Sequence, residues 1–177
     1  MNFKSLIRTI PDYPKPGILF RDITTLIANP VGLRAAVDGL VLPFLTAGIQ
    51  HVAGIEARGF IFGAALAYQL SAGFVPVRKP GKLPHKTIAH DYELEYGTNR
   101  VEAHVDGLAK GERVVIVDDL LATGGTALAA ASLVEQMKAE VVEAAFLIEL
   151  TDLPGRARLE KHGVRVHALT GFREDEG

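Results

Sequence analysis

The sequence of 177 residues contains no cysteine. Disulfides, thiolate metal sites and a cysteine nucleophile are therefore excluded. No apolar run approaches the ~18 residues that a membrane-spanning helix needs, and residues 1–17 lack the apolar core of a signal peptide. The formal net charge is only −2, which argues against a dominant nucleic-acid-binding surface. From these absences we expect a cytoplasmic protein with neither a membrane nor a nucleic acid as its partner.

The composition is typical of a globular protein, with 48% hydrophobic and 23% charged residues. The length fits a single domain, 1–177, that can bury a substantial core. From residue 30 onward helical and strand patterns alternate, which predicts an α/β fold with a mainly parallel central sheet flanked by helices. The predicted helices are 30–47, 59–70, 125–138 and 154–162, and the predicted strands are 51–56, 74–78, 114–117, 141–150 and 164–169.

Two segments depart from this alternation. Residues 1–28 contain Pro11, Pro14 and Pro16. They predict an irregular hood that wraps over the sheet and can roof a ligand site at the carboxyl ends of the strands. Residues 79–90 are polar and are interrupted by Pro80 and Pro84, which predicts a long surface loop. A hairpin with strands 91–96 and 100–105 is expected to follow this loop.

The strongest functional signal is the segment 114–126, VVIVDDLLATGGT. A glycine-rich turn at the start of a helix lets several backbone N–H groups converge on one anion, aided by the helix dipole. The residues of this turn, here called the phosphate loop, are Ala122, Thr123, Gly124, Gly125 and Thr126. The alternative interpretation is an ordinary helix start after a buried strand.

Asp118 and Asp119 lie directly upstream of the phosphate loop. Carboxylates cannot bind the phosphate itself, but they suit the hydroxyls of a ribose about one sugar's length away. Their alternative role is that of solvated loop charges. The Walker pattern and the dinucleotide pattern GxGxxG are both absent, so neither nucleoside triphosphate hydrolysis nor NAD binding is favoured.

With its acids and phosphate loop, this segment resembles the phosphoribosyl pyrophosphate loop of type I phosphoribosyltransferases. From residue 11 almost to the end, the chain is similar to the adenine phosphoribosyltransferases within that family. The resemblance implies the type I phosphoribosyltransferase fold, with a small N-terminal base-binding hood, about 1–28, and a flexible lid loop, about 79–91. The other matching segments are DYPKPGILFRDIT (12–24), GIEARGFIFG (54–63), VPVRKPGKLP (75–84), YELEYGT (92–98) and ELTDLPGR (149–156).

Arg58 follows a predicted strand and can bind a second anion together with the N–H groups of its turn. The resemblance implies that this anion is pyrophosphate, and it also implies a cis or otherwise strained peptide near Ala57. A surface arginine that caps a loop is the alternative.

Basic residues gather on the predicted lid: Arg78, Lys79, Lys82 and Lys86. A run of charge is usually a solvated face, but beside two anion-binding turns it suggests a lid that closes over pyrophosphate and excludes water. The resemblance implies that one basic residue serves the neighbouring subunit of a homodimer. His85 and His90 also lie on the lid, and we expect neither to be a metal ligand or a base.

The resemblance assigns two residues after the lid. Glu95 is the candidate acid–base residue near adenine N7, and Tyr96 packs against the ribosyl region. A positioned carboxylate contributes about 10²–10⁴-fold in such a role. A glutamate on a strand surface opposite a basic neighbour is the alternative.

The base-recognition element is expected at Leu19, Phe20 and Arg21. Phe20 offers a ring on which a purine can stack, and backbone groups of Leu19 and Arg21 can read the exocyclic amine. Leu153 is expected on the opposite face of the base. For Phe20, the alternative is an ordinary hydrophobic anchor of the hood.

The remaining polar candidates are weaker. Three histidines, His51, His162 and His167, lack metal-site spacing and are expected to be structural. Glu149 and Asp152 flank the end of a strand, where either can be functional or a cap.

Together these features predict transfer of the 5-phosphoribosyl group from phosphoribosyl pyrophosphate to adenine, which gives AMP and pyrophosphate through an oxocarbenium-like transition state. Magnesium is expected to arrive with phosphoribosyl pyrophosphate and to be held mainly by substrate and water. Three alternatives stay open. They are a regulator that senses phosphoribosyl pyrophosphate, an assembly subunit with a relic loop, and a sister transferase for hypoxanthine, xanthine or another base.

Overall fold

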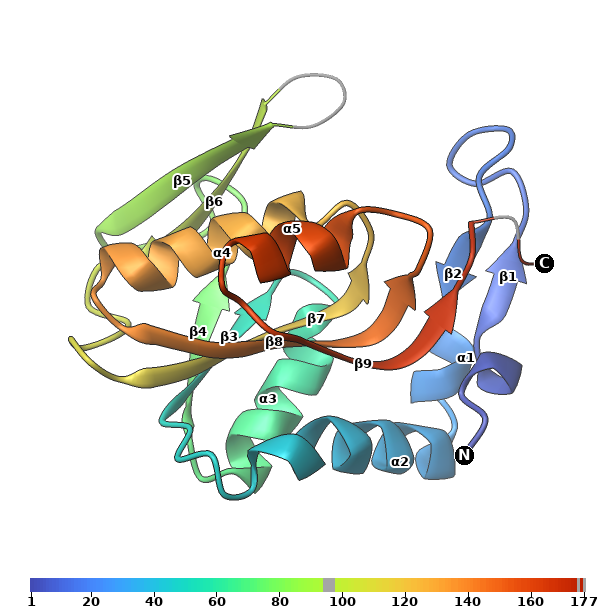
Figure 1. The fold of residues 1–177 in the computed structure, drawn as a ribbon, viewed down its shortest axis with the longest axis horizontal. Coiled ribbons are helices and arrows are strands. Elements are labelled where there is room, and N and C mark those ends of the chain that lie inside the picture. The colour runs from blue at the N-terminus through green and yellow to red at the C-terminus, as the bar shows by residue number, and fades with distance from the viewer. Residues whose placement is uncertain (94–97, 175, 177) are drawn as a thin grey trace.

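The computed structural model describes residues 1–93, 98–174 and 176, and its centre is a five-stranded parallel sheet. The strand order is β4-β3-β7-β8-β9. Figure 1 shows α2 and α3 on one face of this sheet and α4 and α5 on the other. The strands are β3 (His51–Ile55), β4 (Gly73–Val77), β7 (Arg113–Leu121), β8 (Glu140–Leu150) and β9 (Val166–Phe172); the helices are α2 (Pro30–Val41), α3 (Gly59–Gln69), α4 (Gly125–Gln136) and α5 (Gly155–Lys161). The predicted α/β class and parallel sheet are confirmed.

The order of the strands creates one switch point in the sheet. From β3 the chain passes through α3 to β4 on one side, and β7 then pairs with β3 on its other side. Helices that follow β3 and β7 leave in opposite directions, so a crevice opens between the carboxyl ends of these two strands. This is the place where an open α/β sheet binds its ligand.

Apolar side chains fill both faces of the sheet. Because parallel strands are covered on both sides, β7 and β8 are apolar almost without interruption. Ile116 and Phe146 pack towards α4, whereas Val117 and Leu147 pack towards α2 and α3. All four side chains are almost completely buried, so the strand ends that carry the site are held firmly.

The hood is a separate two-stranded antiparallel sheet beyond β9 (Figure 1). It consists of the 3₁₀ helix η1 (Lys4–Leu6), β1 (Arg8–Ile10), β2 (Phe20–Asp22) and the short helix α1 (Thr24–Ile27). The backbone N–H of Thr24 and the guanidinium of Arg8 both hydrogen-bond to the Asp22 carboxylate, and they lower its pKa to about 2. The expected hood that lies outside the main sheet is confirmed.

A second antiparallel pair, β5 (Thr87–Glu93) and β6 (Thr98–His104), forms a hairpin on the α4 side of the sheet. Arg78 and Glu102 exchange backbone hydrogen bonds of 2.9 and 2.7 Å, which attach the hairpin to the end of β4. The hairpin therefore stands directly over the carboxyl edge of the sheet.

Several predicted boundaries were wrong. The helix 30–47 ends at Val41 and continues only as the 3₁₀ turn η2 (Leu42–Phe44), because Pro43 has no N–H for the helical ladder. Strand 114–117 extends through Leu121 since β8 continues to pair with it, and strand 164–169 is shifted to Val166–Phe172.

In the lid region, residues 87–90 form part of β5 rather than a loop. The strand predicted at 91–96 begins earlier, at Thr87, and its residues 94–96 lie outside the described residues. The strand predicted at 100–105 is displaced to Thr98–His104. Thr98 and Asn99, expected in the turn, belong to β6.

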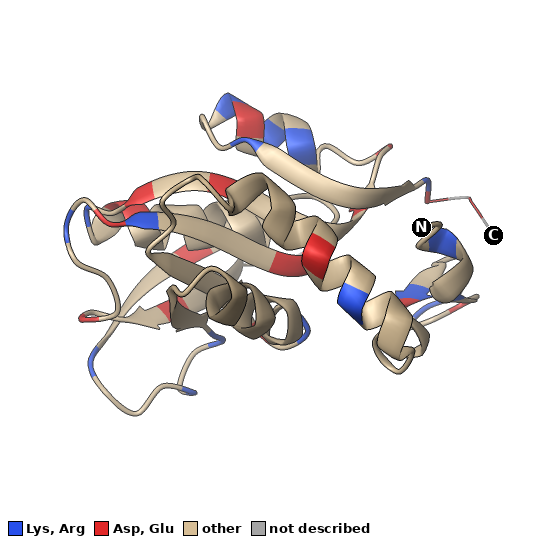
Figure 2. Ribbon diagram, turned by 90° about the horizontal axis from the view of Figure 1, so that it is seen from below, with Lys and Arg blue, Asp and Glu red and all other residues tan. Residues whose placement is uncertain are grey.

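Acidic and basic residues are interspersed along the chain (Figure 2). In the described part of the chain, no helix is both long and apolar enough to cross a membrane.

Candidate active site

A cavity of about 430 Å³ lies at the switch point, between the carboxyl ends of β3 and β7. The turn after β3, the end of β4, the acids of β7, the first turn of α4 and the hairpin all contribute to its walls. The lining residues that matter below are Glu56, Ala57, Arg58, Arg78, Lys79, Tyr92, Asp118, Asp119 and Thr126. The structure thus brings together polar residues from four separate segments of the chain: the turn after β3, the end of β4, the hairpin, and β7 with the start of α4.

The phosphate loop encloses a smaller hollow of about 90 Å³ beside this cavity. All five residues predicted for the loop line the hollow, and α4 begins at Gly125. Gly124 adopts a φ of +79°, a left-handed conformation that favours glycine. The backbone N–H groups at the start of α4 are therefore available to an anion in the hollow.

Gly155 supports the phosphate loop from behind, a role that the sequence did not reveal. A Cβ on Gly155 would stand 2.2 Å from the Ala122 carbonyl oxygen, and one on Gly124 would stand 2.9 Å from the Gly155 oxygen. The guanidinium of Arg158, also on α5, donates to the Thr123 carbonyl at 3.1 Å. A glycine at the second position of the predicted helix 154–162 was the available signal.

The two acids of β7 occupy different surroundings. Asp119 is only 4% exposed, whereas Asp118 is partly buried and accepts a hydrogen bond of 2.8 Å from the Asp119 N–H. Burial raises the pKa of the Asp118 carboxyl well above its usual value, and the neighbouring Asp119 charge raises it further. A Cβ on Gly59 would lie 2.8 Å from Asp118 Oδ1, so α3 can approach this acid only through a glycine.

Arg58 connects the acids with the hood. Its Nε lies 2.5 Å from Asp119 Oδ2, and its guanidinium carbon lies 5.3 Å from the centre of the Phe20 ring. The Glu56–Ala57 peptide bond just before it is cis, as the family resemblance implied. The side chain remains 42% exposed, so it can turn from Asp119 to an incoming anion.

Glu56 is a site residue that sequence reasoning missed. Its Oε2 accepts hydrogen bonds from Arg78 Nε at 2.8 Å and from the Lys79 N–H at 3.1 Å. The two side chains meet because Ile55 and Val77 are partners in the parallel register, so the next residue of each strand lies side by side. Since each is the last residue of a predicted strand, 51–56 or 74–78, the pairing of these strands was the signal available in the sequence.

The other lid cations are less engaged. Lys79 lines the large cavity, while Lys82 and Lys86 are exposed. Arg78 also donates to the Lys82 carbonyl at 3.1 Å, which folds the lid loop back on the end of β4.

The hairpin touches the phosphate loop through one hydrogen bond. The Thr126 hydroxyl donates to the Tyr92 hydroxyl at 3.1 Å. Glu95 and Tyr96, the predicted acid–base and ribosyl residues, lie outside the described residues.

One of the predicted base-recognition residues, Leu19, lines a third cavity of about 300 Å³. Leu19 lines this cavity together with Leu150 and Glu174. Phe20 packs edge-on against Tyr13, with ring centres 5.1 Å apart, in addition to its contact with Arg58. Leu153 is partly buried in the turn after β8, and Leu150 of that strand lines the cavity.

The weaker candidates have structural partners. His162 lies 3.2 Å from Glu135, His167 Nε2 lies 3.3 Å from the Gly39 carbonyl, and His51 Nδ1 lies 3.2 Å from Glu112. On the lid, His90 Nδ1 lies 3.3 Å from Gln136, and His85 packs against His104 with ring centres 6.0 Å apart.

The acids at the end of β8 are also paired. Glu149 forms an ion pair of 2.5 Å with Arg156, and the Asp152 carboxylate accepts the Glu174 N–H. Within residues 1–93, 98–174 and 176, no group of three or more such side chains is arranged to hold a metal ion.

Comparison with known proteins agrees with this geometry. Residues 44–172 match the family described as phosphoribosyl transferase domain. An adenine phosphoribosyltransferase of Bradyrhizobium sp. (strain BTAi1 / ATCC BAA-1182) is 60% identical over 172 residues, which cover 97% of this chain and 96% of that protein. The chain belongs to the adenine phosphoribosyltransferases.

Solved structures of adenine phosphoribosyltransferases have the same fold. The enzyme from Rhodothermus marinus superposes with a TM-score of 0.91 at 54% identity, over 96% of both chains. The enzyme from Saccharomyces cerevisiae, solved in complex with adenine and an imino-altritol bisphosphate, gives a TM-score of 0.88 at 40% identity, over 94% of this chain and 96% of that one. The type I phosphoribosyltransferase fold is thus confirmed.

Proposed function

We propose that the chain transfers the 5-phosphoribosyl group of phosphoribosyl pyrophosphate to adenine and releases AMP and pyrophosphate, a purine salvage reaction. The observation that carries this proposal is the cavity at the switch point, where the phosphate loop, two carboxylates and an arginine face one space. Membership of the adenine phosphoribosyltransferases supports the choice of adenine.

The phosphate loop binds the 5-phosphate. Backbone N–H groups of residues 122–126 and the hydroxyls of Thr123 and Thr126 donate to its oxygens. When the phosphate enters, the Thr126 hydroxyl turns to it from Tyr92. A phosphate held here places the ribose ring over Asp118 and Asp119.

The two acids act on the sugar. Their oxygens accept hydrogen bonds from the ribose hydroxyls, and their charge favours the cationic sugar that forms as the C1′–O bond to pyrophosphate breaks. A positive sugar also favours the charged form of Asp118, although burial opposes that form in the free protein. Adenine N9 attacks C1′ from the opposite face while Glu95 accepts the proton carried on N7 of the reacting tautomer.

Pyrophosphate binds at the β3–β4 side of the cavity. Arg58 exchanges Asp119 for the pyrophosphate oxygens, and Lys79 with Lys82 adds charge from the lid. Arg78, held by Glu56, faces the same anion from a fixed position. Much of the acceleration comes from positioning and preorganised charge.

The adjacent carboxylates of Asp118 and Asp119 are oxygen donors of the kind that Mg²⁺ prefers. They would share a magnesium ion with oxygens of phosphoribosyl pyrophosphate and with water. Such an ion would neutralise the charge of the leaving pyrophosphate.

Residues 79–91 close over the bound pyrophosphate and exclude water, since the cationic sugar would otherwise be hydrolysed. Glu95 serves as the acid–base residue near adenine N7, and Tyr96 packs on the ribosyl group. Adenine stacks on Phe20, backbone groups of Leu19 and Arg21 read its amine, and Leu153 approaches its other face.

We also propose a homodimer in which a lid cation reaches the partner's site. Large apolar side chains are exposed on the face of the sheet that carries α2 and α3: Leu42 at 69%, Leu45 at 61% and Tyr68 at 87%. Sedimentation equilibrium should give twice the chain mass of 19.0 kDa, and Tyr68→Glu should shift the population towards the monomer. A wild-type protein of single chain mass would contradict the dimer.

The choice of acceptor is tested by measuring pyrophosphate release with magnesium and each of adenine, guanine, hypoxanthine, xanthine and orotate. Adenine should be preferred by at least ~10²-fold in kcat/KM over the oxopurines, because a site that pairs with an amine leaves groups unpaired against an oxo analogue. Preference for an oxopurine would point to a sister transferase. Absence of release with every base would leave a sensor of phosphoribosyl pyrophosphate as the better reading.

A further inference from the structure

The side chain of Arg21 points away from the large cavity. In the β1–β2 ladder, Arg21 is opposite Thr9 and Phe20 is opposite Ile10. Successive residues of a strand face opposite sides, so Phe20 meets Arg58 while the Arg21 side chain faces the other way. The Arg21 residue is only 3% exposed, which is unusual for a guanidinium without a role.

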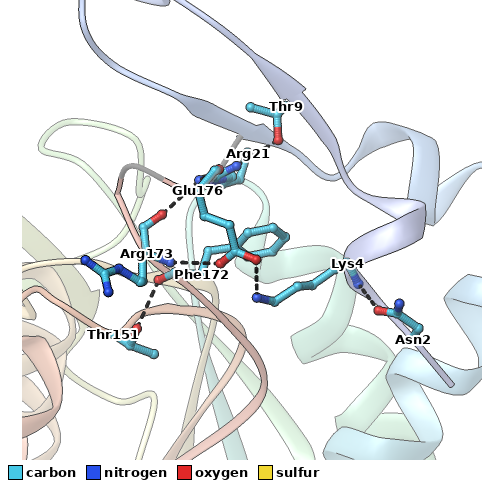
Figure 3. Close-up of polar contacts among 8 residues, drawn as sticks. All are labelled: Asn2, Lys4, Thr9, Arg21, Thr151, Phe172, Arg173 and Glu176. Atoms are coloured by element: carbon cyan, nitrogen blue, oxygen red, sulfur yellow. Dashed lines mark hydrogen bonds and ion pairs between the residues drawn. The ribbon is translucent and has the colours of Figure 1, made fainter.

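The partners of Arg21 come from both ends of the chain (Figure 3). Nη1 donates to Thr9 Oγ1 at 2.7 Å, and Nη2 donates to the backbone carbonyls of Arg173, at 2.9 Å, and Glu176. The guanidinium carbon lies 4.4 Å from the centre of the Phe172 ring. One planar group thus joins β1, the end of β9 and the segment that follows β9.

Lys4 fixes the same segment from a second side. Its Nζ lies 2.5 Å from Glu176 Oε1 and 4.9 Å from the centre of the Phe172 ring (Figure 3). Further along, the Glu174 N–H donates to both oxygens of Asp152, at 3.1 and 2.9 Å. Residues 172–174 and 176, here called the C-terminal segment, are therefore held between the hood and the end of the main sheet.

This junction lies next to the cavity of about 300 Å³. The hood supplies Gly17, Ile18 and Leu19 to its wall, β8 supplies Leu150, and the C-terminal segment supplies Glu174. Leu150 is paired with Phe172 in the β8–β9 register. The contacts of Arg21 and Lys4 consequently set the distance between the hood wall and the sheet wall of this cavity.

We propose that Arg21 is a positioning residue for adenine: together with the C-terminal segment it fixes the base-reading backbone of Leu19–Arg21 relative to the sheet. The inference rests on the proposed function, because it concerns the base side of the same site. The guanidinium acts through the backbone that it holds and does not touch the base. The phosphate loop follows β7, and β8 and β9 lie between β7 and the hood (Figure 1), so phosphoribosyl pyrophosphate binding should be insensitive to this junction.

The test is a comparison of the KM values for the two substrates in full-length variants. Arg21→Gln removes the positive charge and one of the two terminal NH₂ groups of the guanidinium, and it should raise the KM for adenine ~10-fold or more. The KM for phosphoribosyl pyrophosphate should stay within about twofold of wild type. Lys4→Met loosens the C-terminal segment without disturbing the buried guanidinium, so it should raise the KM for adenine by a few-fold. If Arg21→Gln does not fold, this second variant tests the inference.

Arg165→Gln is the matched control. Arg165 is 73% exposed, pairs with Glu143 at 3.4 Å and lies just before β9 at the amino edge of the sheet, so both KM values should be unchanged. Equal increases in both KM values, or an adenine KM that neither Arg21→Gln nor Lys4→Met alters, would overturn the inference. Failure of the wild type to release pyrophosphate would instead overturn the proposed function.

Discussion

Asp118 and Asp119 are adjacent in sequence, yet their carboxylates lie in different electrostatic environments. Asp119 has a cation, Arg58, 2.5 Å away, whereas Asp118 has a backbone N–H and a second carboxylate as its neighbours. Burial and like charge raise the pKa of Asp118. Because this pKa exceeds that of the unfolded chain, the folded state loses stability as pH rises from the ordinary carboxyl range through the raised pKa.

Asp118→Asn should therefore stabilise the protein while it removes activity. Asn keeps an oxygen for the Asp119 N–H but carries no charge. At pH 7 the free energy of unfolding and the melting temperature should both rise, because the variant lacks a charge that burial and the neighbouring Asp119 oppose.

Thermal melts at several pH values check this prediction. The gain should shrink at acid pH, where Asp118 of the wild type is protonated as well. If the variant melts at a lower temperature than the wild type at pH 7, the charge of Asp118 does not destabilise the folded protein.

At the scale of elements, the phosphate loop depends on the start of α5. Gly155→Ala would place a methyl group 2.2 Å from the Ala122 oxygen, and backbone at that distance must shift. We expect the KM for phosphoribosyl pyrophosphate to rise about 10-fold, equivalent to ~1.4 kcal/mol of lost binding.

Gly39→Ala in α2 is the control for this substitution. Its Cβ would meet the end of the Leu169 side chain at 3.0 Å, which can move, and alanine favours the helix. An unchanged KM in a folded Gly155→Ala protein would mean that the loop does not need this support.

The elements also show which features a sequence can reveal. Apolar runs predicted all five strands of the sheet, because burial on both faces leaves a pattern in the residues themselves. The extension of β7 through Asp118 and Asp119 was not predictable, since it depends on pairing of Asp118 with Phe146 and Leu120 with Ile148. The three-residue strands β1 and β2 are likewise products of tertiary contact.

At the scale of the whole molecule, the candidate site residues were easier to predict from the sequence than the long-range contacts that position them. Local motifs identified the phosphate loop, the acids and Arg58, because each lies within one turn of the chain. Arg21 and Arg173 are 152 positions apart, and no periodicity links residues at that distance. The ion pair between Glu56 and Arg78 is intermediate in how well the sequence predicts it, because parallel pairing of two predicted strands places these residues side by side.

The central claim is that the phosphate loop and its two acids carry phosphoribosyl transfer to adenine. The most direct measurement is the rate of AMP formation from adenine and phosphoribosyl pyrophosphate with magnesium, for the wild type and for the double variant Asp118→Asn, Asp119→Asn. Asp38→Asn is the control, because Asp38 is a half-exposed acid on α2 that pairs only loosely with Arg34, at 3.6 Å.

The wild type and the Asp38→Asn control should form AMP at similar rates, and each should release one pyrophosphate for every AMP formed. The double variant should be slower by at least ~10³-fold, since two charges that stabilise the cationic sugar are lost. A wild type that forms no AMP, or a folded double variant that forms it at a near-normal rate, would contradict the account.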